Sequence, residues 1–252
     1  MEVVLLTTDN DQLTTILAKI IICITLAKVK TKHMDFKRAL KFLTDLKKNN
    51  NKDWFDKNKK EYDKIRKEVI EFVTGMIKRI QSFDPTLAGL EAKQCMFRIN
   101  RDVRFSKDKS PYKSNFGLSF NRNGKSSAFA GYYLHIQPGE CFIAGGSYAP
   151  MPEHLAAIRQ EIDYNFDEFK KIISNKEFKK YFGVLRGEKL SRPPKGYEAD
   201  NPAIEFLKHK AFLMWHEFDQ KKLSEKDFEK YCATVFKAMK PMLDFINRAI
   251  EG

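Results

Sequence analysis

Cationic and apolar side chains alternate in residues 95–113, which read CMFRINRDVRFSKDKSPYK. Arg98, Arg101 and Arg104 follow one another at intervals of three residues. Guanidinium groups bind carboxylate and phosphate oxygens through paired hydrogen bonds. A buried guanidinium without a partner is costly, so each of these arginines must reach water, a carboxylate or an anion.

Two interpretations of this segment remain open. In the first, Arg98, Arg101, Arg104, Lys109 and Lys113 build a pocket for an oxyanion. In the second, the arginines form a structural Arg–Asp network with distant acids, which fixes the loop 102–114. Tyr112 caps an anion in the first case and only packs in the second. The candidate ligand-binding residues of the segment are Arg98, Arg101, Asp102, Arg104, Asp108, Lys109, Tyr112 and Lys113.

Positive charge is concentrated around this segment. Residues 98–125 contain eight basic residues and two acidic ones, a balance of +6, whereas the whole chain of 252 residues carries +13. Such an excess favours anionic partners, which include phosphorylated small molecules, nucleic acid and anionic surfaces.

His135 is the best-placed candidate for proton transfer. It alternates with Tyr133 and Gln137 in a segment rich in strand-forming residues, and pairing of Gln137 with Glu140 would place it opposite Phe142. The sequence contains no GxSxG, HExxH or Walker motif and no cysteine and histidine spacing typical of zinc sites, so no metal site is predicted. The pattern leaves the cofactor unknown and does not decide whether the protein is an enzyme.

Hydrophobic periodicity predicts helices at both ends of the chain and strands between them. Helices are expected over 35–48, 53–81 and 152–163, as two short helices within 166–182, as a short helix from Asn201, and near the C-terminus. Strands are expected over 94–101, 115–120, 128–137 and 141–148. These elements predict an α+β fold, in which an antiparallel sheet of four or more strands (about 94–148) packs against the N-terminal and C-terminal helices. Trp54 and Trp215 are expected to pack in the core.

Residues 1–33 differ from the rest of the chain and are predicted to be an atypical N-terminal extension, followed by a single domain over 34–252. The apolar run 16–27 is interrupted by Lys19 and is too short to span a bilayer, although a helix that binds a membrane peripherally is an alternative. The four cysteines lack a pattern, which is typical of a reducing compartment, so a cytoplasmic location is expected.

The segment FRINRDVRFSKDKSPYK resembles the signature RxxRDxRFxxDKxxY of the family known as domain of unknown function 2461. Arg98, Arg101, Asp102, Arg104, Phe105, Asp108, Lys109 and Tyr112 fill its fixed positions. The resemblance extends over about residues 34–250 and includes GYYLHIQPG and PPKGYEADNPAI. It implies a conserved hypothetical protein of a mainly bacterial family and supplies no activity.

Three functions are therefore weighed. The first is binding of, or catalysis on, a small phosphorylated or carboxylated ligand in an Arg/Lys-lined pocket. The second is nucleic-acid binding, which ranks lower because Val103 and Phe105 are expected to be buried rather than presented for stacking. The third is a structural or protein-interaction module in which the arginines only stabilise the fold. A membrane partner is not expected.

Overall fold

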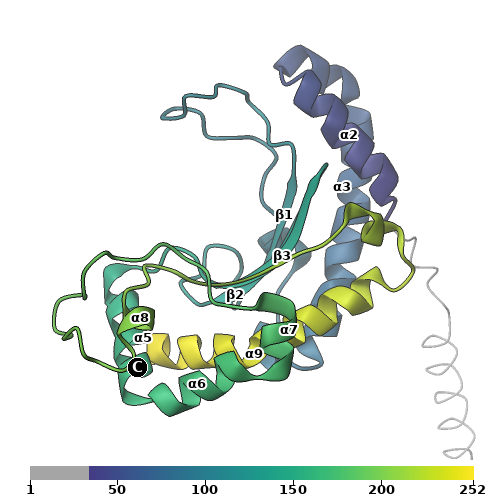
Figure 1. Ribbon diagram of the computed structural model, residues 1–252. Helices are drawn as coiled ribbons and strands as arrows, with labels where there is room; N and C mark the ends of the chain where they lie inside the picture. Colours follow the sequence, from purple (N-terminus) through teal and green to yellow (C-terminus); the bar gives the residue numbers. More distant parts are fainter. Residues whose placement is uncertain (1–33) are drawn as a thin grey trace, which may run out of the picture. The chain divides into compact units, whose positions relative to one another are not determined.

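A four-stranded antiparallel sheet forms the centre of the domain described by the computed structural model, which covers residues 34–252. The strands lie in the order β1-β2-β3-β4, with β1 at Phe116–Phe120, β2 at Gly131–Gln137, β3 at Glu140–Ser147 and β4 at Phe212–Glu217. Helices flank the sheet, which confirms the predicted α+β fold (Figure 1).

Two long helices precede the sheet, and each begins at a residue suited to cap it. The side chain of Asp35 accepts a hydrogen bond from the Arg38 amide at the start of α2, Phe36–Lys48. Asn51 accepts one from the Trp54 amide at the start of α3, Lys52–Gln81. These oxygens satisfy amide groups that the first helical turn leaves unpaired.

The remaining helical elements separate or follow the strands. They are the 3-10 helix Pro85–Leu87, α4 at Ala92–Cys95, α5 at Pro152–Tyr164, α6 at Phe166–Ser174, α7 at Lys176–Phe182, α8 at Ile204–Leu207, the 3-10 helix Gln220–Ser224 and α9 at Phe228–Glu251. Figure 1 shows α2 and α3 side by side, whereas α5, α6 and α7 pack along α9 and α8 lies beside α5.

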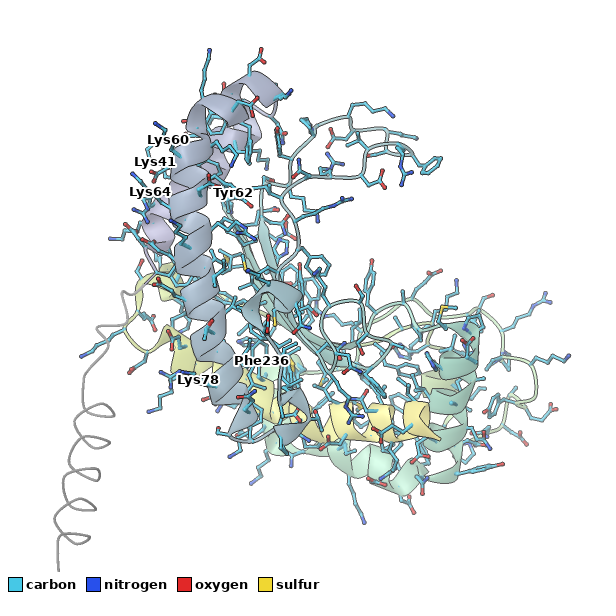
Figure 2. All side chains as sticks on the ribbon, turned by 180° about the vertical axis from the view of Figure 1, so that it is seen from behind. Lys41, Lys60, Tyr62, Lys64, Lys78 and Phe236 are labelled. Carbon is cyan, nitrogen blue, oxygen red and sulfur yellow. The ribbon has the colours of Figure 1, made fainter. Side chains whose placement is uncertain are left out.

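One face of the sheet packs against α9 and the N-terminal helices. On β2, Tyr132, Leu134 and Ile136 are buried on this face, whereas the alternating residues Tyr133 and His135 point to the opposite one. Phe236 of α9 reaches Tyr132, with their ring centroids 5.1 Å apart. On the outer side of the domain, Lys60 and Lys64 of α3 point away from the sheet (Figure 2).

The prediction of a strand over 94–101 is wrong. The side chain of Gln94 accepts a hydrogen bond from the Glu91 amide, and residues Ala92–Cys95 form one helical turn. The chain then runs beside β1 and the segment before it, but only the isolated bridges Met96↔Leu118 and Asn100↔Tyr112 form. The alternating pattern therefore indicates an extended segment without a regular strand.

The sheet gains its fourth strand from a part of the chain that the sequence did not single out. Strand β4 pairs with β3 in antiparallel register, with Trp215 opposite Ala144. Before it, residues 186–200 form two isolated bridges, Arg186↔Leu213 with β4 and Lys189↔His209 with the chain just before β4.

The predicted extension over 1–33 lies outside the described residues. Within residues 34–252, no helix is long and apolar enough to cross a membrane.

Candidate functional site

A cavity of about 750 Å³ lies over the face of the sheet that α9 does not cover. Aromatic side chains from three of the four strands line it, together with Phe97 from the segment beside β1. The strand residues in this group include Tyr133, His135, Phe142 and Trp215. The cavity is thus built on the rigid centre of the domain.

Three of these rings stack in a row across β2, β3 and β4. The centroids of His135 and Phe142 are 4.5 Å apart, and those of Phe142 and Trp215 are 3.7 Å apart. Register pairs His135 with Phe142, as the sequence predicted, and the side chain of Arg186 lies over the outer face of Trp215 at 5.8 Å. Both faces of Phe142 are covered, so a ligand meets the ring edges of this row.

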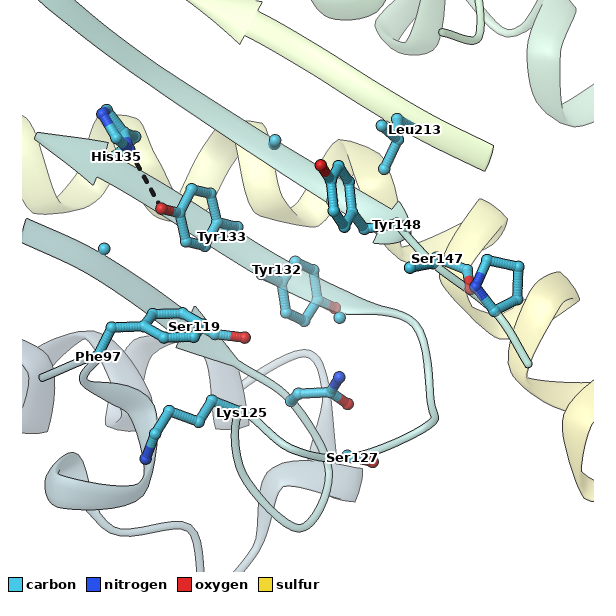
Figure 3. A pocket seen from close by; sticks show the side chains of 18 of the residues that line it. Phe97, Ser119, Lys125, Ser127, Tyr132, Tyr133, His135, Ser147, Tyr148 and Leu213 are labelled. Atoms are coloured by element: carbon cyan, nitrogen blue, oxygen red, sulfur yellow. Dashed lines mark hydrogen bonds between the residues drawn. The ribbon is translucent and has the colours of Figure 1, made fainter. Parts of the chain in front are cut away.

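Tyr133 and His135 form a hydrogen-bonded pair at the cavity wall (Figure 3). Nδ1 of His135 lies 3.1 Å from the Tyr133 hydroxyl and 3.4 Å from Nδ2 of Asn115. An amide nitrogen only donates, so Nδ1 accepts and a neutral His135 carries its proton on Nε2. Burial raises the pKa of Tyr133 to about 12 and lowers the pKa of His135, which keeps both side chains uncharged near neutral pH.

Acid is expected to destabilise the domain through two histidines. Burial lowers the pKa of His135, and it also lowers the pKa of His209, where the charge of Lys189 adds to the effect. The unfolded chain therefore binds more protons than the folded one as the pH falls below about 6.5, and stability decreases. We expect urea unfolding to show lower stability at about pH 5.5 than at about pH 7.5, a range above the ordinary carboxylate pKa.

His135→Gln supplies the comparison for this effect. The variant removes one of the two groups, so the loss of stability between the two pH values should be smaller than in the wild-type protein. An unchanged loss would show that His135 is not the responsible group.

The two lysines of the cavity have no carboxylate partner among the described residues. Arg101, Lys113 and Lys125 line the cavity, and no Asp or Glu does so among the described residues. Lys113 Nζ lies 5.3 Å from the centre of the Phe97 ring, and burial together with the charge of Arg98 lowers the pKa of Lys113. Neither lysine makes an ion pair within the described domain, so the cavity carries an uncompensated positive charge.

Of the residues proposed from the sequence, only Arg101, Lys113 and His135 line the cavity. The others surround the loop that the motif forms beside it. Arg104 makes a two-point contact with Asp102, through Nε at 2.9 Å and Nη2 at 2.6 Å, and Lys109 Nζ donates to the Val103 carbonyl at 3.0 Å. Arg98 is exposed and makes no ion pair with a described carboxylate.

Arg101 connects the loop to the cavity. Its guanidinium pairs with Asp108 and also donates to the Ser110 carbonyl at 3.1 Å and the Ser106 hydroxyl at 3.2 Å. Hydrogen bonds from Ser110 and Arg101 lower the pKa of Asp108 to about 2, so this acid stays ionised and holds the arginine. Arg101 and Arg104 thus form the ion pairs of a network, but their partners are the local acids Asp108 and Asp102 and not the distant acids that were expected.

Tyr112 packs in the interior at the end of the loop. Its ring stacks on Phe55 with centroids 4.1 Å apart. The side chain of Asn50 bonds both backbone groups of Tyr112, accepting from the amide at 3.0 Å and donating to the carbonyl at 2.9 Å. The residue anchors the loop and does not reach the cavity.

Several cavity residues were not proposed from the sequence. Lys125 is one of the eight basic residues counted over 98–125, whereas Asn121, Ser119 and Ser127 were not singled out. Figure 3 shows Ser119, Lys125 and Ser127 along one part of the cavity, with Tyr133 and His135 along another. Trp215 also lines the cavity, because β4 lies next to β3, and the expectation that it packs in the core is wrong.

Within the described domain, no group of three or more His, Cys, Asp or Glu side chains is arranged to hold a metal ion. No curated protein and no solved structure gives a significant match to the chain. A protein-family model described as "Conserved hypothetical protein (DUF2461)" matches residues 38–245, so the chain belongs to this family.

Proposed function

We propose that the protein binds a small anionic ligand, phosphorylated or carboxylated, in the cavity over the sheet. The observation that carries the proposal is the composition of the cavity wall: Arg101, Lys113 and Lys125 line it, and no described carboxylate does. A cation without a paired acid attracts an anion most strongly where protein excludes part of the water.

The two lysines are better candidates for ligand contact than the arginine. Arg101 already donates to Asp108, Ser106 and Ser110, whereas Lys113 contacts the Phe97 ring and Lys125 makes no ion pair with a described residue. The aromatic side chains beside the lysines favour a ligand whose anionic group is attached to a ring or another apolar body.

The Tyr133–His135 pair supports a catalytic extension of this function. The neutral imidazole accepts a hydrogen bond from the phenol, so the pair can pass a proton between the cavity and Nδ1. If the ligand has a group beside Tyr133 that gains or loses a proton, the Tyr133–His135 pair would transfer that proton. If the protein only binds its ligand, the pair would only fix the cavity wall.

Isothermal titration with benzoate, phenyl phosphate and the uncharged benzamide tests the proposal. We expect at least one of the two anions to bind and benzamide to bind much more weakly. Lys113→Met and Lys125→Met keep the aliphatic stem but remove the charge, and each should weaken the binding of the anion by about tenfold or more.

Lys60→Met is the matched control, since Lys60 points outward from α3 (Figure 2) and should leave the affinity unchanged. Failure of both anions to bind, or equal affinity of all three variants and the wild-type protein, would refute the proposal. Tight binding of an oligonucleotide that weakens steeply with salt would favour the nucleic-acid alternative instead.

A further inference from the structure

Exposed apolar side chains gather around the cavity. Within residues 34–252, the large hydrophobic side chains that are exposed are Phe97, Phe105, Tyr148, Met151, Tyr164 and Val184. Three of them, Phe97, Tyr148 and Met151, line the cavity, and the last two are 81% and 55% exposed. Single exposed apolar side chains are ordinary on a protein surface, whereas a group of them beside a cavity indicates a binding surface.

These three side chains lie on opposite sides of the cavity. Phe97 lies at the outer edge of the sheet, where its amide donates to the Gly117 carbonyl of β1 at 3.2 Å. Tyr148 and Met151 follow the end of β3, which is separated from β1 by β2. Figure 3 shows Phe97 on one side of the cavity and Tyr148 on the other. Neighbouring strands lie about 4.8 Å apart, so the three intervals from the Phe97 segment to β3 span about 14 Å.

Positive charge lies at only one of these two sides. The backbone amide of Lys113 donates to the Ile99 carbonyl at 2.7 Å, and that of Lys125 donates to the Gln94 carbonyl at 3.1 Å. Both lysines therefore belong to the side of Phe97, and Figure 3 shows Lys125 near that ring. The opposite side contains residues 147–151, SYAPM, which include no charged residue. The cavity thus has a cationic side and an apolar side.

Small residues on the sheet connect the two sides. Those that line the cavity between them are Ser119 of β1, Gly131 of β2, and Ala144 and Gly146 of β3. Register places Gly131 opposite Gly146. The larger Tyr133, opposite Ala144, is held toward His135 by their hydrogen bond. A ligand can therefore lie across the strands without displacing a bulky side chain.

We propose that the ligand of this cavity is an elongated amphiphilic anion. Its carboxylate or phosphate lies beside Lys113 and Lys125, and its apolar body, an alkyl chain or an extended ring system, crosses the sheet to cover Tyr148 and Met151. This inference rests on the proposed function, because it specifies the body of the anion that the same lysines bind. A single ring would end above the middle of the sheet and leave Tyr148 and Met151 in water, whereas a longer body removes them from it.

A series of benzoates with a lengthening alkyl chain tests the inference on the wild-type protein. Isothermal titration compares benzoate with its para-ethyl, para-butyl and para-hexyl derivatives. Each added methylene group should strengthen binding about twofold to fourfold, because it covers apolar surface that water otherwise contacts. The uncharged para-hexylbenzamide should bind much more weakly than para-hexylbenzoate. Affinities that do not rise with chain length would overturn the inference.

Two substitutions locate the far end of the ligand. Tyr148→Ser and Met151→Ser each shorten an exposed side chain, and Met151 is the N-cap residue of α5, a position that serine suits. Each should reduce the ratio of para-hexylbenzoate to benzoate affinity by about threefold or more. Tyr164→Ser is the matched control, since this tyrosine is exposed but does not line the cavity. The same ratio in all three variants and the wild-type protein would contradict the proposed path.

This inference and the proposed function fail in different ways. If the benzoates bind more tightly than the benzamides but chain length has no effect, only the elongated body is refuted. If chain length strengthens binding but the carboxylates bind no better than the amides, the proposed function fails, and the anionic group of this ligand with it.

Discussion

Replacing Phe236 with alanine is expected to destabilise the domain by about 3–5 kcal/mol, the range for truncating a buried phenylalanine. Phe236 is fully buried on α9, with its ring centroid 5.7 Å from that of Phe120 and 5.1 Å from that of Tyr132 (Figure 2). The substitution would leave a void between the helix and two strands. Urea unfolding followed by circular dichroism measures the effect.

Phe105→Ala is the matched control, since this side chain, which was wrongly expected to be buried, is 96% exposed in the motif loop. Its truncation should change the free energy of unfolding by no more than about 0.5 kcal/mol. Similar losses for the two variants would show that α9 does not pack against the sheet as described.

Gly146→Ala is expected to cost at least about 3 kcal/mol, because it combines backbone strain with a steric overlap. Gly146 has φ of 123°, a conformation that other residues avoid, and a Cβ atom there would overlap the carbonyl oxygen of Phe212 on β4. The strand β4 would have to move away from β3, and the cavity wall that both strands form would change.

Gly139→Ala separates the cost of the backbone strain from the cost of the steric overlap. Gly139 also has a positive φ, 81°, but a Cβ atom there meets nothing within 4 Å. This variant should lose only the conformational part, about 1 kcal/mol. Thermal and urea unfolding of both variants measure the difference, and equal losses would exclude the overlap with Phe212 as a cause.

The helices that cover the sheet could be predicted from local patterns. The apolar stripe of 53–81 and the cap at Asn51 lie within a few residues of each other, and the structure places the helix at Lys52–Gln81. The same holds for the hairpin that pairs His135 with Phe142, because a turn at Pro138-Gly139 fixes its register. The helix and the register of the hairpin are both determined by residues that lie close together in the sequence.

The partners of the strands could not be predicted in the same way. An alternating pattern shows only that a segment is extended, and it does not show whether continuous pairing follows. Residues 94–101 alternate but pair only at bridges, whereas 212–217 became a full strand beside β3. The cavity depends on this choice, because Trp215 enters its wall with β4.

The role of the arginine motif was also underdetermined by the sequence. Counting charges left too few local acids for the cations, so the pocket and a network with distant acids both stayed open. The structure shows that Asp102 and Asp108 satisfy Arg104 and Arg101, while Lys113 and Lys125 are left for the cavity. Which acid pairs with which arginine depends on the path of the loop, and the number of charges does not determine that path.

The irregular segments on either side of the sheet also have a consequence for solubility. The outermost strands, β1 and β4, would each expose a row of unpaired backbone groups, which favours pairing with another chain. Met96 bridges to Leu118 on the free side of β1, and Arg186 exchanges backbone hydrogen bonds of 2.8 Å and 3.0 Å with Leu213 on the free side of β4. Both segments therefore protect the sheet against edge-to-edge aggregation, and a deletion in either one should promote it.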